Sequence, residues 1–141
     1  MERSNPEIVK SESPSARDVR GPASVVPLAS EPPAKLFVDP PLPGPLAFGR
    51  VVIQYRTENL RIVPVYGPGA TDVSPRVGHL HVTVDGLSWH WLDASGEPLT
   101  LNGFSAGRHS ILIELANPVH KIIDRATITF IIPGVSGVGP C

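Results

Sequence analysis

The sequence has only one cysteine, Cys141, and it is the last of the 141 residues. An internal disulfide is therefore excluded, and this thiol could pair only with another molecule. No apolar run reaches the ~18 residues that a membrane-spanning helix needs. The net charge is −1, and from Ala47 onward seven basic residues balance seven acidic ones. Without a basic patch we expect no nucleic-acid partner, and without a long apolar run no transmembrane segment.

Sequence motifs of the common catalytic classes are also missing. No glycine-rich loop follows a strand and opens a helix, as a phosphate-binding loop would. Ser88 and Ser110 stand near histidines in the sequence, but neither lies in the G-x-S-x-G pattern of a nucleophile elbow. We therefore assign no catalytic residue and no binding site for an organic cofactor.

Proline is distributed unevenly along the chain. Ten of the 17 prolines precede Ala47, whereas all five histidines and both tryptophans follow it. Residues 1–35 lack the apolar content that would offset the entropy of ordering, so we predict a disordered, proline-rich tail. Residues 36–133 are expected to form one domain, and residues 134–141 a flexible C-terminal tail. No apolar segment typical of a signal peptide is found, which favours a cytoplasmic location for the chain as written.

The domain contains short segments rich in β-branched and aromatic residues, separated by turn-forming residues, and no convincing amphipathic helix. This pattern predicts an all-β fold, a single antiparallel immunoglobulin-like β-sandwich of about seven strands. The proline-rich stretch at residues 40–45 is expected to be polyproline-like. Pro64 should place its segment at a sheet edge or a bulge. The expected strands outside the hairpin described next are residues 36–38, 50–56, 60–66, 98–101, 109–115 and 125–132.

Residues 77–92 are predicted to form a β-hairpin. Asp85-Gly86 is a strong signal for a two-residue turn, because both central positions of a type I′ turn need positive φ. A two-residue turn pairs His81 with His90, and a four-residue turn shifts the partners but leaves each residue on its face. One face carries Leu80, Val82, Val84, Trp89 and Trp91, which we interpret as core, and the other carries His79, His81, Thr83 and His90.

The histidine face is the chemically suggestive surface of the sequence. Residues i and i+2 on a strand point the same way, and a cross-strand neighbour lies close to both. His79, His81 and His90 could therefore converge on one metal ion, with His109 as a candidate fourth ligand. Nitrogen ligands suit Zn(II) or Cu(II), and a soft Cu(I) site is not expected from one distal cysteine and an N-terminal methionine. His120 follows Asn117-Pro118 and is expected to be exposed in a turn.

Several motifs also resemble a known family. They are the run Pro75 to Asp85, Trp89-His90-Trp91, Gly107-Arg108-His109 and Ile113 to Asn117. In these residues the chain resembles the bacterial family known only as domain of unknown function number 6130, over Leu36 to Pro133. The resemblance implies a periplasmic or secreted protein, because members are usually exported, and it implies no particular activity. A looser similarity links the chain to small periplasmic sandwiches, some of them suspected of binding copper.

Three functional hypotheses follow from the sequence. The first is an accessory domain that binds copper or zinc for sequestration or delivery. The second is an immunoglobulin-like module that binds a protein or an extracellular ligand through loops or an edge strand, without a metal. The third is a small metal-dependent enzyme that uses an open coordination position on the same histidines. The sequence does not specify the oligomeric state.

Overall fold

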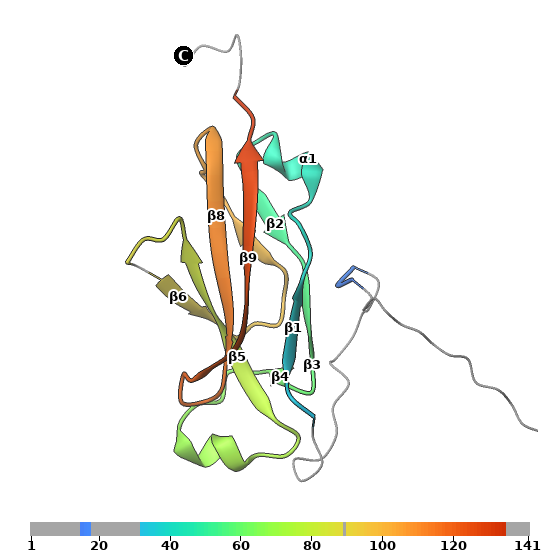
Figure 1. Cartoon of the computed structure of the whole chain (residues 1–141), viewed down its shortest axis with the longest axis vertical. Coiled ribbons are helices and arrows are strands. Elements are labelled where there is room, and N and C mark those ends of the chain that lie inside the picture. The colour runs from blue at the N-terminus through green and yellow to red at the C-terminus, as the bar shows by residue number, and fades with distance from the viewer. Residues whose placement is uncertain (1–14, 18–31, 89, 135–141) are drawn as a thin grey trace, which may run out of the picture.

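The computed structural model describes residues 15–17, 32–88 and 90–134, and this part of the chain is mostly β with almost no helix (Figure 1). The all-β prediction is therefore confirmed. No helix in the described ranges has the length and apolar character to cross a membrane. Cys141, Trp89 and most of the predicted tails lie outside the described residues. The elements are β1 (Lys35–Val38), α1 (Pro43–Leu46), β2 (Val51–Ile53), β3 (Tyr55–Glu58), β4 (Arg61–Ile62), the 3₁₀ helix η2 (Pro68–Asp72), β5 (Val77–Val84), β6 (His90–Asp93), β7 (Leu99–Leu101), β8 (Gly107–Ala116) and β9 (Ile122–Ile132).

The strands form three sheets. The largest has the order β4-β5-β8-β9, with β6 also paired to β5, and the pairs β1-β3 and β2-β7 form two small sheets. All pairs are antiparallel except β4-β5, which is parallel. That exception departs from the predicted purely antiparallel sheet. It arises because a long connection containing η2, rather than a hairpin, links β4 to β5. The immunoglobulin-like topology and the count of about seven strands stay predictions.

The hydrophobic core lies where the large sheet meets the two small ones. Alternating residues of β5 and β8 supply its centre, and β1, β2, β7, the end of β9 and Leu60 also contribute. This is the period-two pattern of strands with one buried face. The fully buried members with no exposed area are Val51, Ile53, Leu60, Leu80, Val82, Ile111, Ile113 and Leu115.

Several predicted boundaries change around the prolines. The predicted polyproline stretch instead contains the one-turn helix α1, which begins with Pro43 where a missing N–H costs nothing. The strand predicted at 50–56 is split into β2 and β3 at Gln54. The strand predicted at 60–66 is reduced to β4, which ends two residues before Pro64. Proline provides no donor for a ladder, so the pairing stops before it.

The hairpin forms, but its register is that of the longer turn. Asp85 and Gly86 have φ values of 53° and 67°, and Leu87 N–H donates to the Val84 carbonyl at 3.0 Å, as predicted for the turn. His90 lies opposite Thr83, and His81 lies opposite Leu92. The two-residue register that pairs His81 with His90 is therefore wrong. The described residues of the hairpin nevertheless keep their predicted faces, because the shift is by two.

A short N-terminal segment is held against the domain by Asp39. The buried Asp39 carboxylate accepts hydrogen bonds from the backbone N–H groups of Ala16 and Arg17, at 3.0 and 3.2 Å. The Arg17 guanidinium Nε lies 3.2 Å from the same carboxylate. Residues 15–17 thus have a defined docking point inside the tail that was predicted to be disordered.

Candidate metal centre

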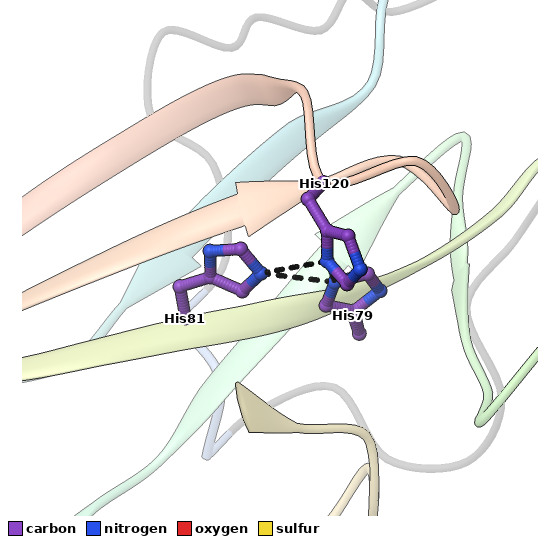
Figure 2. Close-up of side chains that lie close together, drawn as sticks. All are labelled: His79, His81 and His120. Carbon is purple, nitrogen blue, oxygen red and sulfur yellow. Dashed lines mark hydrogen bonds between the residues drawn. The ribbon is translucent and has the colours of Figure 1, made fainter. Parts of the chain in front are cut away.

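Three histidines from two parts of the large sheet meet at one point (Figure 2). His79 and His81 lie two residues apart on β5, so both imidazoles project from the same face. His120 lies in the turn between β8 and β9. Because β8 pairs antiparallel with β5 and places Ala116 opposite His79, the turn that follows β8 lies beside His79. The sheet register therefore brings together residues separated by 41 positions.

The ring nitrogens of this cluster form a nearly equilateral triangle. His79 Nε2 lies 3.0 Å from His81 Nε2 and 3.1 Å from His120 Nδ1, and the last two nitrogens are 3.3 Å apart. In a tetrahedral site with Zn–N bonds of ~2.0–2.1 Å, neighbouring ligand nitrogens are ~3.3–3.4 Å apart. The three nitrogens therefore have almost the spacing that a shared metal ion requires.

Hydrogen bonding alone does not account for all three contacts. Each imidazole nitrogen carries either one N–H or one lone pair. Among three mutually close nitrogens, at most two contacts can pair an N–H with a lone pair, and the third must place two like groups face to face. Three lone pairs directed at a cation would have no such conflict. The arrangement thus fits metal ligation better than a hydrogen-bond network.

Burial keeps two of these imidazoles uncharged. His79 is fully buried, and desolvation, helped by its neighbours His81 and His120, lowers the pKa of His79 to about 4. Desolvation also lowers the pKa of His81, as does His120, while the nearby Glu114 carboxylate acts in the opposite direction. Neutral imidazole is the state that binds a metal ion. At neutral pH both β5 histidines are therefore already in their ligating form.

His79 also carries a buried polar atom without a partner. Its Nδ1 has no hydrogen bond to any of the described residues. An unsatisfied buried polar group costs roughly 1–3 kcal/mol of stability. Ligation through Nε2 would leave the proton on Nδ1, so a bound metal ion would use the Nε2 lone pair of His79 without giving Nδ1 an acceptor.

The turn that carries His120 is organised by Asn117. The Asn117 side-chain oxygen accepts hydrogen bonds from the backbone N–H groups of Val119 and Lys121, both at 2.9 Å. His120 N–H donates to the Asn117 carbonyl at 2.8 Å, and His120 itself has a φ of 67°. Gly67 N–H donates to the Pro118 carbonyl at 3.1 Å and ties the turn to the start of η2. The His120 side chain is exposed, but these hydrogen bonds fix the backbone of the turn that carries it.

Gly78 allows β8 and Leu60 to approach β5 closely beside the cluster. A Cβ at this position would collide with the Ala116 carbonyl and lie 2.9 Å from the Leu60 side chain. Glycine thus lets β8 and Leu60 pack directly on β5 beside His79. Close backbone approach is a common reason for glycine inside a strand.

The structure brings together two of the four predicted ligands. His79 and His81 are in the cluster, whereas His90 and His109 are not. His90 is exposed, lies opposite Thr83, and its ring centroid is 6.1 Å from that of His81. His109 lies near the far end of β5, where Nδ1 is 2.7 Å from Asp85 Oδ2 and Nε2 contacts the Ser105 carbonyl at 2.8 Å.

His120 is the member of the cluster that the sequence interpretation left out. A histidine that follows Asn117-Pro118 has the sequence signature of a solvated turn residue, and the strand spacing indicates only His79, His81 and His90 as neighbours. The signal was the pairing of β5 with β8, because a residue just after Ala116 must lie near His79. That pairing is a tertiary feature that no spacing in the sequence encodes.

An aromatic ring borders the cluster. The Tyr66 ring packs edge-on against His79, with centroids 5.2 Å apart, and is nearly parallel to His120 at 6.3 Å. Tyr66 therefore covers one side of the His79 and His120 rings. His81 instead lies opposite Glu114, its cross-strand partner on β8.

Comparison with known proteins agrees with the resemblance noted from the motifs. No curated protein and no solved structure shows significant similarity to this chain. A family model, in contrast, matches residues 5–138, which is nearly the whole sequence. On that match, the chain belongs to the family of unknown function DUF6130.

Proposed function

We propose that this protein binds a transition-metal ion, Zn(II) or Cu(II), through His79 Nε2, His81 Nε2 and His120 Nδ1. Its role would be to sequester the ion or deliver it. The observation that carries the proposal is the triangle of ring nitrogens with sides of 3.0, 3.1 and 3.3 Å.

The ligand set limits the choice of metal. Three imidazole nitrogens suit Zn(II) and Cu(II), whereas oxygen ligands are needed for Mg(II) or Ca(II). No thiolate or thioether lies among the three ligands, so the set does not favour Cu(I). The protein should therefore bind Zn(II) and Cu(II), and it should not bind Mg(II).

A second candidate function is catalysis at the same ion. Three protein ligands with a fourth position for water is the arrangement of catalytic zinc centres such as that of carbonic anhydrase. His120 is exposed and His81 is partly exposed, so the cluster is accessible from solvent. When bound, the metal would supply an activated water molecule, and the histidines would hold the ion. We place this hypothesis second, since the geometry describes the ligands and not a substrate.

The test is the metal content of four matched proteins. Untagged parent protein is exposed to zinc or copper, exchanged into metal-free buffer and analysed by mass spectrometry of the elements. The variants are His120→Asn, His81→Asn and the control His90→Asn. Asparagine suits position 120 because it tolerates the positive φ of that residue while being too short to ligate in place of imidazole.

We expect about one metal ion per chain in the parent and in His90→Asn, and little metal in the other two variants, because each of them lacks one of the three ligands. Circular dichroism checks that all four proteins remain folded. If His120→Asn retained the metal and His90→Asn lost it, the ligands would be His79, His81 and His90, as predicted from the sequence. That result would contradict the proposal. Empty parent protein would remove both metal hypotheses and leave the protein-interaction module.

A further inference from the structure

A second site lies at the opposite end of β5 from the three histidines. It is a pocket of about 730 Å³ between the tip of the β5-β6 hairpin and the segment that joins β7 to β8. Asp85 borders the pocket and is six residues beyond His79, which corresponds to ~20 Å along an extended strand. The pocket is therefore separate from the metal centre.

The walls of the pocket are an extension of the hydrophobic core. Val84, Trp91, Leu101 and Phe104 all line it, and all four are partly buried side chains packed against the core. Leu87 stands at its rim with 57% of its surface exposed. Pockets that hold small molecules commonly have volumes of about 300–1,000 Å³ and mainly apolar walls. Both the size and the lining are those of a small-molecule site.

The two charged groups of the pocket are already paired with each other. His109 Nδ1 donates to Asp85 Oδ2 at 2.7 Å, and the His109 Nε2–H donates to the Ser105 carbonyl at 2.8 Å. Asp85 Oδ1 accepts the Ser110 N–H at 2.8 Å. The imidazolium thus has both donors occupied and its charge compensated by the carboxylate. Among the described residues that line the pocket, an ionic ligand would therefore find no unpaired countercharge, and desolvating its charge there would be costly.

We propose that this pocket binds an uncharged, largely apolar small molecule with an aromatic ring. The Phe104 and Trp91 rings offer surfaces for packing such a ring. Thr100 and Ser105 at the border could hydrogen-bond one or two polar atoms of the ligand. This site is independent of the proposed metal function and does not require a metal ion.

Two fluorescent probes of the same shape but different charge test whether the pocket binds an uncharged apolar molecule. N-phenyl-1-naphthylamine is uncharged and fluoresces in apolar surroundings, and 1-anilinonaphthalene-8-sulfonate has the same rings with one negative charge. We expect saturable binding of the neutral probe, and at least about tenfold weaker binding of the anionic one because its charge must be desolvated. Tighter binding of the anion would overturn the assignment of an uncharged ligand.

Substitutions at the rim of the pocket and away from it test where the neutral probe binds. Leu87→Asp puts a charge at the rim of the pocket and should weaken binding of the neutral probe about tenfold or more, while Leu87→Met should retain it. Ile131→Asp is the matched control, because Ile131 is 63% exposed on β9 and does not line the pocket. An equal loss in Leu87→Asp and Ile131→Asp, or no loss in either, would refute the site. His120→Asn should bind the probe like the parent, which separates this test from that of the metal centre.

Discussion

At the scale of single residues, the histidines of this chain occupy three chemically different environments. His79 is buried and has a lowered pKa, His90 is exposed on the hairpin, and the Asp85 carboxylate holds the pKa of His109 above its usual value. The amino acid is the same in each case. Its protonation state and possible role depend on what the fold places beside it.

The Asp85–His109 pair predicts a pH-dependent contribution to stability. Partial burial raises the pKa of Asp85, but hydrogen bonds from His109 and the Ser110 N–H outweigh this effect and lower that pKa overall. Hydrogen bonds to Asp85 and to the Ser105 carbonyl raise the pKa of His109. The His109 contribution is therefore complete below its unfolded pKa of 6.5 and is lost as the pH rises through its folded pKa. The Asp85 contribution is complete above 3.8 and is lost as the pH falls.

Asp85→Asn should thus destabilise the protein most at mildly acidic pH. Asparagine keeps the positive φ of the turn and can still accept the Ser110 N–H, so mainly the charge is removed. We expect a loss of about 1 kcal/mol at pH 5.5, a modest value because the pair is partly solvated. The loss should shrink at pH 9, as measured by urea denaturation. A pH-independent loss would show that the turn, rather than the ion pair, was damaged.

At the scale of elements, the β8-β9 turn adds the third histidine to the two that β5 carries. β5 alone supplies two histidines, and the third depends on a five-residue turn held by Asn117. Gly78 contributes by letting β8 approach β5 closely. The candidate centre is therefore a property of the β5-β8-β9 unit and not of the hairpin.

Asn117→Ala should weaken metal binding without removing a ligand. The alanine variant loses both side-chain hydrogen bonds that fix the turn, so His120 must be ordered when the ion binds. Residues that support ligands typically change metal affinity by about 10–100-fold. Competition with a chromophoric chelator measures this, with Asn102→Ala as control, since Asn102 accepts a hydrogen bond from Arg50 Nε in a different loop. Equal affinities of the two variants would contradict a positioning role for Asn117.

At the scale of the whole molecule, the proposed ion would connect distant parts of the chain. His79 and His120 are 41 residues apart, and the unfolded chain does not hold them together. Binding should therefore favour the native state. The described part of the chain also holds an apolar pocket at the other end of β5, so the same strand borders two separate candidate sites.

Zinc should raise the thermal midpoint of the parent protein. At a free zinc concentration about 100 times Kd, linkage predicts ~2.7 kcal/mol of added stability. For a domain of this size that corresponds to a rise of roughly 10 °C. Thermal unfolding followed by circular dichroism, with and without zinc, measures the shift. His90→Asn should show the same rise and His120→Asn almost none, and a rise in both variants would indicate that zinc binds elsewhere.

The sequence by itself determined the local features of this protein. Period-two alternation predicted the buried face of the hairpin strand, as Leu80 and Val82 show, and Asp85-Gly86 determined where the hairpin turns. The family motifs also identified the family. These features depend on backbone conformation and on burial of neighbouring residues, which a linear pattern encodes.

Only the tertiary structure decided which histidines meet. The hairpin register moved His90 away from His81, and the pairing of β5 with β8 brought His120 beside His79. The parallel contact of β4 with β5 and the pocket at the far end of β5 are likewise products of packing. Register and long-range strand pairing are set by the sum of many contacts across the sheet, so no local spacing could reveal them.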